Sequence, residues 1–567
     1  MRPHTARLRW FAASFLLLSL LGVASGAAPF TPTADPAPSI SSLLSQGSHL
    51  EKAREWAKAI EMYEEGLRRW PDDRTLKDRL EQCQSHFRLS RRYSDTSFRT
   101  ALLRLPREQA LRLYNETLLT LQTRYVDRLI LGDLVRRGTE NLKTAVDDPE
   151  FVATNLPGRS RGDIDRFREE LVRQVGARRI ADRRDAQEAV RLACDLGRTW
   201  LGMADAPIVM EYVYGACEAL DSHSSFLTPD QQADLYAQID GNFVGLGVEL
   251  RKDDQDLLIV RVLPDSPAIE GGLRSGDVIV AIEGQPTAPL SLDRAANRLG
   301  GREGSVVTVS VRSPGAAASR SLTLRRRAVD VKSIATARIV DRDYGIAYIQ
   351  LTGFQKSTTA ELTAALWGLH RQGMRFLVLD VRGNPGGLLT SAVEVSDTFV
   401  KRGTVVSTRG RSPEQNWTYS AHDSGTWGVP LALLVDEDSA SASEIVAACI
   451  RDNHRGRLIG RKTYGKGSVQ SIYPLGSVDG GLRLTTAKFF SPNGQTLDHV
   501  GVEPDVVVQR SGFRGVSPVA PGQESDPSAD PELNAALRVA RQQLASRQRV
   551  VDPSRSSFEN RRRLLSR

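Results

Sequence analysis

The C-terminal half of the chain alternates short apolar runs with amphipathic helical patterns, and this alternation constrains the fold more than any other feature. The runs Phe376–Val381 and Leu431–Val435 have the length and continuity of fully buried strands. Gly345–Leu351 is a further candidate strand, and Thr359–Arg371 carries apolar residues three or four positions apart, as an amphipathic helix does. Strands that alternate with helices predict an α/β region, which we place at residues 329–512.

Polar loops rich in glycine or serine follow the buried strands of this region. Because active groups in α/β sheets gather beyond the carboxyl ends of the strands, these loops are candidate parts of one site. Their glycines let the backbone approach a ligand closely and direct N–H groups at negative charge. The three loops are Gly383-Asn384-Pro385-Gly386-Gly387, Ser439-Ala440-Ser441-Ala442-Ser443-Glu444 and Gly465-Lys466-Gly467-Ser468-Val469-Gln470.

The serines of the second loop and the lysine of the third suggest nucleophilic catalysis. A serine at the start of a helix can attack a carbonyl carbon while the N–H of the next residue faces the oxyanion that forms. Burial disfavours the ammonium form of a lysine, so Lys466, which two glycines flank, could accept the serine proton. These residues therefore permit a serine–lysine pair.

Three other interpretations of the loops stay open. The serine run can be only a helix cap, a position that serine favours. Residues 460–466 imitate the phosphate-binding pattern G-x-x-x-x-G-K, although Gly467 stands where serine or threonine would ligate magnesium. A Ser–His–Asp triad would need His454 or His499, and neither lies in a loop directed at Ser441.

From about residue 236 the pattern changes to short strands separated by turn residues. The expected elements are strands at Val244–Leu250, Leu257–Leu263, Val278–Ile282, Val306–Val311 and Leu322–Leu324 and a helix at Ser291–Leu299. The order of motifs over residues 236–328 resembles a PDZ domain, a small β-barrel. The resemblance implies that Gly245, Leu246, Gly247 and Val248 bind the C-terminal carboxylate of a peptide, which adds a strand to the sheet edge. A small β-barrel without a ligand is the alternative.

Helical patterns dominate the chain before the PDZ-like region. Residues 40–90 resemble a tetratricopeptide-repeat (TPR) hairpin, with Gly47, Ala59 and Gly66 letting two antiparallel helices approach closely. A generic helical hairpin is the alternative. The hairpin is expected either to dock a protein partner or to extend the helical region at residues 95–235, whose periodicity indicates packing.

The two ends of the chain differ from the rest. Residues 1–28 join a basic start to the apolar run Phe11–Ala28, which ends in small residues and is typical of a signal peptide. An uncleaved N-terminal anchor, and with it membrane association, is the alternative. In both cases the protein is expected to be exported, to a periplasm or cell envelope. Residues 513–567 form a tail rich in Pro, Ser and Gly, with one helix near Pro531–Leu544.

Composition excludes several classes of protein. The 76 Lys+Arg against 68 Asp+Glu give a net charge of +8, but much of that surplus lies at the two ends, so no nucleic-acid partner is expected. The 4 cysteines form no CxxC pair and the 8 histidines form no HxxxH or HxH pair, so no metal site and no cofactor are expected. Export permits disulfides, but buried free thiols are the expected state of the cysteines.

Taken in order, the PDZ-like region and the three loops resemble the carboxyl-terminal processing peptidases, also called tail-specific proteases. The resemblance covers roughly residues 200–510 and includes Asp221–Pro229. It implies a ClpP/crotonase-like ββα catalytic core with the PDZ domain inserted. The expected fold is therefore a multidomain α+β protein with an N-terminal helical region, a PDZ-like barrel and that core.

The resemblance also implies roles for individual residues. In the family the catalytic lysine follows the serine by 25 residues, which selects Ser441 and Lys466, and a glutamine, here Gln470, orients the lysine. The implied oxyanion donors are the N–H groups of Ala442 and of Gly386 or Gly387, of which we favour Gly387. The expected function is an exported serine endopeptidase that cleaves proteins near their C-termini, with substrate tails captured by the PDZ domain. The alternative is a non-catalytic PDZ/TPR peptide-binding scaffold in the cell envelope.

Overall fold

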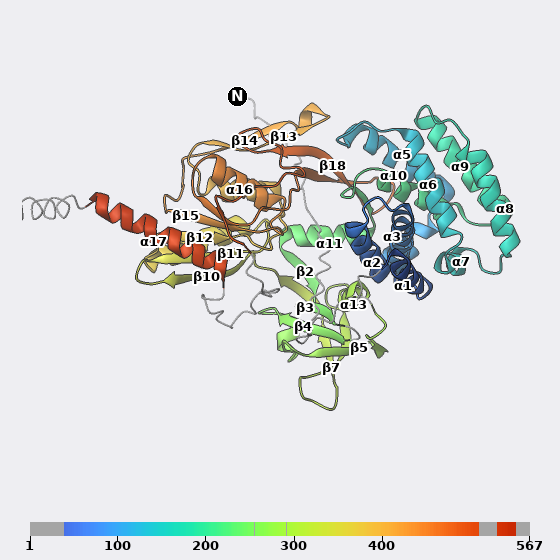
Figure 1. The fold of residues 1–567 in the computed structure, drawn as a ribbon. Helices are drawn as coiled ribbons and strands as arrows, with labels where there is room; N and C mark the ends of the chain where they lie inside the picture. The colour runs from blue at the N-terminus through green and yellow to red at the C-terminus, as the bar shows by residue number, and fades with distance from the viewer. Residues whose placement is uncertain (1–38, 254–255, 291, 510–529, 552–567) are drawn as a thin grey trace, which may run out of the picture. The chain divides into compact units, whose positions relative to one another are not determined.

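A computed structural model describes residues 39–253, 256–290, 292–509 and 530–551 (Figure 1). Their contacts divide them into two units. The helical unit holds residues 39–233 and 471–485, and the core unit holds residues 234–470 and 486–551. The predicted signal segment, residues 1–28, lies outside the described residues.

The helical unit is built around a single large apolar core. Its short strand β1 (Ser225–Leu227) pairs antiparallel with the first residues of β18 (Gly481–Phe490). Helix α11 (Pro229–Asp240) begins in this unit. The other elements are α1 (Ile40–Lys52), α2 (Trp56–Arg69), α3 (Arg74–Ser94), α4 (Thr96–Thr100), η1 (Leu102–Arg104), α5 (Arg107–Arg124), α6 (Leu131–Ala145), α7 (Pro149–Asn155), α8 (Arg161–Leu171), η2 (Val172–Gly176), α9 (Arg183–Leu201) and α10 (Asp205–Glu218).

Helices α1, α2 and α3 share a smaller apolar core of their own. The predicted close approach of the first two helices is confirmed, because a Cβ on Gly47 would lie 2.3 Å from the Tyr63 hydroxyl oxygen. A Cβ on Gly66 would likewise lie 3.2 Å from side-chain atoms of Leu43 and Leu76. The likeness of this hairpin to a TPR stays a prediction.

The PDZ-like part of the core unit contains a sheet in the order β3-β4-β5-β7-β8. The expected single strand at Val244–Leu250 is wrong, because Gly247 has a φ of +80° and separates two strands that enter different sheets. The first of these, β2, pairs with β9, and the second, β3, lies at an edge of the larger sheet. The elements are β2 (Asn242–Gly245), β3 (Val248–Asp253), β4 (Asp256–Val262), α12 (Pro267–Glu270), β5 (Val278–Ile282), β6 (Gln285–Pro286), α13 (Leu292–Leu299), β7 (Val306–Arg312), β8 (Arg320–Arg325) and β9 (Arg327–Asp330).

The rest of the core unit contains a six-stranded sheet in the order β10-β11-β12-β15-β16-β19. All neighbours in it are parallel except β10, which runs antiparallel to β11. A second sheet joins β13 and β14 to the last residues of β18, with β17 also on β18. The elements are β10 (Ile334–Asp341), β11 (Ile346–Leu351), α14 (Thr358–Arg371), β12 (Phe376–Asp380), α15 (Leu389–Asp397), β13 (Gly403–Gly410), η3 (Pro413–Gln415), β14 (Trp417–Ala421), β15 (Leu431–Val435), α16 (Ala442–Asp452), β16 (Arg457–Gly460), β17 (Ser468–Pro474), β19 (Val506–Val507) and α17 (Pro531–Val551).

Both faces of the six-stranded sheet are buried, and strand residues alternate between them with the period of two that a strand requires. In β12, Leu377 and Leu379 join the core formed with α14, α15 and α16, which we call the α14–α16 face. Phe376 and Val378 join the core formed with α17, which we call the α17 face. The helix near Pro531–Leu544 that the sequence predicts extends to Val551 and packs on β12, β15 and β16.

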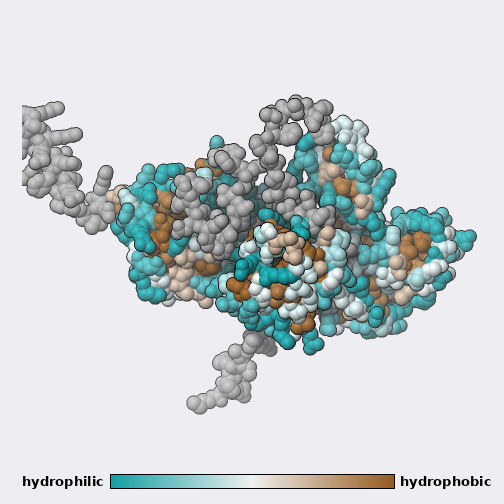
Figure 2. All heavy atoms as spheres, turned by 90° about the horizontal axis from the view of Figure 1, so that it is seen from below, coloured by the Kyte–Doolittle hydropathy of each residue, from teal (hydrophilic) through white to brown (hydrophobic). Residues whose placement is uncertain are grey.

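The surface seen in Figure 2 is mostly hydrophilic, with apolar residues in small separate patches. Scattered apolar positions of this kind are normal on folded domains. Among the described residues, no helix has the length and apolarity needed to cross a membrane. Cys83, Cys194, Cys217 and Cys449 are buried free thiols, as the sequence analysis expects.

Candidate active site

The three loops follow β12, β15 and β16, neighbouring parallel strands of the six-stranded sheet, at their carboxyl ends. We call them the glycine loop (residues 381–388), the serine loop (residues 436–441) and the lysine loop (residues 461–467). The carbonyl oxygen of Asn384 accepts hydrogen bonds from the Ala440 N–H at 3.0 Å and from the Ser443 hydroxyl at 2.9 Å. The glycine and serine loops therefore lie against each other at this edge of the sheet.

Ser441 occupies the residue before α16 in a backbone conformation that serine rarely adopts. Its φ is +56° and its ψ is −109°, and this strain is of the kind that clusters at functional sites. The other two serines of the run have structural contacts. The Ser439 hydroxyl donates to the Val381 carbonyl oxygen at 2.8 Å, and the Ser443 hydroxyl donates to Asn384, so both belong to the packing between loops.

Glu444 joins the serine loop to the lysine loop. Its Oε2 accepts the backbone N–H of Ser441 at 2.8 Å and the backbone N–H of Lys466 at 2.8 Å. Its Oε1 accepts the Gly465 N–H at 2.7 Å and the Thr463 hydroxyl at 2.6 Å. One carboxylate therefore brings the backbones of Ser441 and Lys466 together.

Glu444 and Lys466 are both removed from water. The Glu444 residue is 0% exposed and Lys466 is 2% exposed. Burial raises the pKa of Glu444 above its ordinary value, while its four hydrogen bonds act in the opposite direction.

A small pocket opens beside Ser441. Gln470 lines it, is 3% exposed and donates to the Ser468 hydroxyl at 2.9 Å. Apolar side chains provide much of the remaining wall. The lining residues are Gly387, Leu389, Ser441, Ala442, Ile445, Ser468, Gln470 and Phe489.

The two glycines of the glycine loop have different surroundings. The Gly386 N–H donates to the side-chain oxygen of Asn384 at 2.9 Å, so it is already used within the loop. Gly387 has a φ of +151°, and a Cβ there would lie 2.1 Å from the Phe354 carbonyl oxygen. Of the two candidates for an oxyanion donor, Gly387 lines the pocket beside Ser441 together with Ala442.

The serine run does cap a helix, since Ser441 and Glu444 form a capping box at the start of α16. The other two interpretations of the loops fit the structure less well. A phosphate-binding loop would lead into a helix, whereas Lys466 is followed by strand β17. His454 lines a separate pocket with Val400 and Arg402, and the His499 side chain is 94% exposed. Within the described ranges, no group of three or more His, Cys, Asp and Glu residues could hold a metal ion.

The four peptide-binding candidates lie together where β2 gives way to β3. Gly245 ends β2, Leu246 is buried in the barrel core and Val248 begins β3. A Cβ on Gly247 would lie 2.3 Å from the Ser266 Cβ, so only glycine fits this turn.

The roles of Glu444 and Asn384 are not predicted from the sequence. The sequence signal for Glu444 was the spacing S-x-x-E from Ser441, which is the pattern of a helix capping box. Asn384 shows no comparable pattern, because its contacts with Leu351 and Ala440 come from other parts of the fold.

Comparisons with known proteins identify two of the domains and the family. The model of Peptidase family S41 matches residues 345–508, and a PDZ domain model matches residues 258–313. A carboxy-terminal-processing protease of Bartonella bacilliformis is 31% identical over 62% of this chain and 87% of its own length. A carboxyl-terminal-processing protease of Synechocystis is 33% identical over 58% of this chain and 76% of its own length. The chain belongs to the carboxyl-terminal processing proteases, a family of S41 peptidases.

A solved structure is also similar. The photosystem II D1 C-terminal processing protease is 27% identical over 71% of this chain and 94% of that chain, with a TM-score of 0.38. The family assignment rests on the sequence relatives. The fold is thus multidomain α+β, with an N-terminal helical region, a PDZ domain and an S41 protease core.

Proposed function

We propose that this chain is a serine endopeptidase that cleaves proteins near their C-termini with a Ser441–Lys466 dyad. Glu444 supports the dyad most strongly, because one of its oxygens accepts the backbone N–H groups of both residues at 2.8 Å. The strained position of Ser441 at the pocket and the burial of Lys466 fit a nucleophile and a neutral base.

In the proposed reaction the Ser441 hydroxyl oxygen attacks the scissile carbonyl carbon and the neutral Lys466 amine takes the hydroxyl proton. The C–N bond then breaks, Lys466 returns the proton to the leaving amine, and an ester to Ser441 remains. Water hydrolyses that ester with Lys466 again as base. Gln470 orients Lys466, and the N–H groups of Ala442 and Gly387 stabilise the oxyanion.

The PDZ domain is proposed to capture the substrate tail. Strand β3 lies at the edge of its sheet, where an extended peptide can add a strand. Of residues 245–248, the first three come just before β3 and Val248 is its first residue. The proposal includes export, from the signal pattern of residues 1–28, with membrane association through that segment as the alternative. It also includes the hairpin of α1 and α2 as the docking site of a protein partner.

The test compares wild type with Lys466→Ala and Lys466→Arg on a fluorogenic peptide that ends in a free apolar carboxyl terminus. Arginine stays protonated and cannot act as a neutral base, so both variants should lose cleavage. The Lys466→Ala protein, which introduces no buried charge, should remain folded as judged by its melting transition. Wild-type cleavage should persist with a chelator and fall at acid pH, as the lysine protonates. Full cleavage by Lys466→Ala would disprove the dyad.

A further inference from the structure

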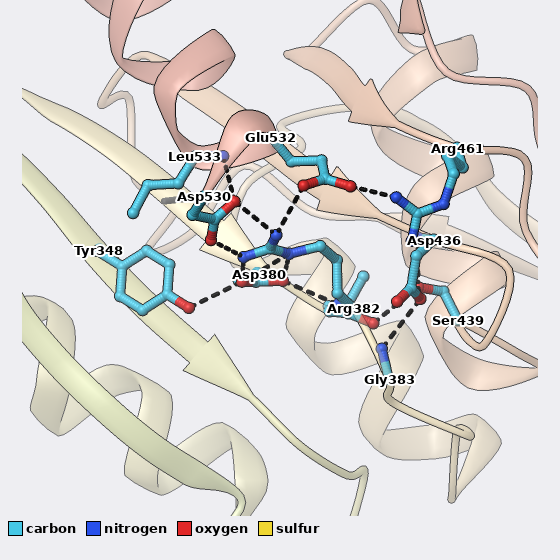
Figure 3. A network of polar contacts seen from close by, with 11 residues as sticks. Tyr348, Asp380, Arg382, Gly383, Asp436, Ser439, Arg461, Asp530, Glu532 and Leu533 are labelled. Carbon is cyan, nitrogen blue, oxygen red and sulfur yellow. Dashed lines mark hydrogen bonds and ion pairs between the residues drawn. The ribbon is translucent and has the colours of Figure 1, made fainter. Parts of the chain in front are cut away.

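A cluster of arginine and carboxylate side chains connects the start of α17 to the loops of the candidate active site (Figure 3). Arg382, two residues beyond β12, lies between two carboxylates. It donates to Asp380 through Nη2 at 2.7 Å and to Asp530 through Nη1 at 2.9 Å and Nη2 at 2.8 Å. Two-pronged contacts of this kind fix the orientation of both groups as well as their distance.

The lysine loop enters the same cluster through Arg461. This side chain donates to Glu437 of the serine loop and to Glu532 at the start of α17. Asp436 of the serine loop accepts the N–H of Gly383, the residue after Arg382, at 3.0 Å. Each of the three loops therefore contributes a residue to a cluster that α17 completes.

Helix α17 is itself held firmly. Its side chains Leu533, Leu537 and Leu544 are buried on the α17 face. Asp530 caps the helix by accepting the Leu533 N–H at 2.9 Å, and the side chain of Asp530 is 22% exposed. Burial alone would raise the pKa of Asp530, but its hydrogen bonds and attraction to Arg382 hold the pKa below its ordinary value. The carboxylate is thus charged and fixed in place at neutral pH.

We propose that Asp530 and Glu532 are positioning residues for the peptidase reaction, an inference that rests on the proposed function. They act through Arg382 and Arg461, which have other carboxylate partners in Asp380 and Glu437. The two α17 carboxylates therefore contribute mainly to the orientation of the arginine side chains and less to neutralising their charge. They tie the glycine and lysine loops to a helix that the sheet holds. Displacing a catalytic group by about 1 Å can lower a rate by about 100-fold, so a small shift of either loop is enough to matter.

The test uses the full chain carrying Asp530→Asn and Glu532→Gln together. Asparagine caps a helix as well as aspartate does, so α17 is kept while the carboxylates are lost. On the same fluorogenic peptide, kcat should fall on the order of tenfold with KM nearly unchanged, because misplaced groups weaken the transition state more than binding. Amide hydrogen exchange in residues 381–388 and 461–467 should become faster.

The matched control is Arg541→Gln, which removes an ion pair of 2.8 Å between α17 and Asp341 of β10. This variant should keep the wild-type kcat and loop exchange. Wild-type kcat in the double variant would overturn the proposal, as would an equal loss in the control. If the wild-type chain cleaves nothing, the proposed function fails. In that case the exchange measurement decides alone: faster exchange supports the role of α17 in ordering the loops, and unchanged exchange refutes it.

Discussion

The two faces of the six-stranded sheet are both apolar, yet they are covered in different ways. Helices α15 and α16 on the α14–α16 face follow their strands directly, so the connections to them are the glycine and serine loops. The α17 face is covered by a helix from the far end of the chain, where Asp530 lies 148 residues beyond Arg382. The local connections carry the proposed catalytic groups, whereas the distant helix supports them. Changes on the first face should therefore abolish chemistry, and changes on the second should weaken it.

Among the changes that test this difference between the two faces, Gly387→Ala is expected to lower kcat the most. The new Cβ would lie 2.1 Å from the Phe354 carbonyl oxygen, so the backbone that carries the proposed oxyanion donor must move. Loss of one such donor costs about 100-fold to 1,000-fold in kcat, and we expect a loss of that size here. Kinetics on the fluorogenic peptide measure it, with Gly383→Ala as a control because no atom lies within 4 Å of its Cβ position.

Wild-type kcat in Gly387→Ala would show that this glycine has no role at the oxyanion. Gly383 also has a positive φ, of +66°, so its alanine variant reports the cost of backbone strain without the clash. The comparison of the two variants therefore separates the two effects.

Glu444→Gln is the next change in order of effect. A glutamine amide offers one acceptor oxygen where the carboxylate offers two, so some of the donors from Ser441, Gly465 and Lys466 lose their partner. An unsatisfied buried donor costs about 1–3 kcal/mol, and we expect the free energy of unfolding to fall by about that amount, together with cleavage. Denaturant unfolding and peptide cleavage measure the two effects.

The control for Glu444→Gln is Glu503→Gln. In the wild-type chain the Glu503 side chain is 64% exposed and forms an ion pair with Lys462 of the lysine loop. Exposed pairs contribute about 0–1 kcal/mol, so this variant should behave as wild type. Equal stability and activity in the two variants would mean that Glu444 does not join the loops.

The α17 face is tested by Leu537→Ala. Leu537 is 7% exposed, and shortening a buried leucine to alanine costs about 2–5 kcal/mol in well-packed cores. Because α17 packs on one side only, we expect the lower part of that range and a smaller loss of kcat than in Gly387→Ala. Gln542→Ala, at an exposed position of the same helix, is the control. A complete loss of cleavage in Leu537→Ala without unfolding would contradict the supporting role of this face.

The smallest expected effect is the change with pH in how firmly α17 is held on the sheet, measured by amide exchange. The folded pKa of Asp530 lies below its ordinary value of 3.8, so its contribution to stability is present above pH 3.8 and is lost as the pH falls through the lower folded value. Cleavage should decrease at a higher pH than this, as Lys466 protonates. Amide exchange of α17 should therefore stay slow over the pH range in which cleavage decreases. If exchange of α17 became faster over that same range, the loss of cleavage and the loosening of α17 would not be separate events.

The sequence predicted the α14–α16 face well and the α17 face poorly. Strands such as Phe376–Asp380 and Leu431–Val435 are short apolar runs, so their burial on both sides is visible from local pattern alone. The helix near Pro531 was also predicted, but its apolar residues do not indicate which surface they cover. Its docking depends on contacts between residues that are far apart in the chain.

The candidate site could be predicted in part: its candidate residues could be identified, but the contacts that join them could not. The order of the loops and the spacing of Ser441 and Lys466 identify the candidates, because these are local features. The bonds that hold the loops together come from Asn384, Glu444 and Arg382, whose partners lie on other loops and on α17. Tertiary contacts of this kind leave little trace in one sequence. The strand break at Gly247 is not predicted for a similar reason, since the close approach of Gly247 to Ser266 is a contact between separate segments of the chain.

The cleavage rate of Ser441→Ala tests the central claim most directly, measured on the fluorogenic peptide beside the melting temperature. Ser441 is 6% exposed at the pocket, and its hydroxyl is the proposed nucleophile. We expect cleavage close to the uncatalysed background and a melting temperature close to that of wild type. Cleavage at the wild-type rate by this variant would contradict the claim.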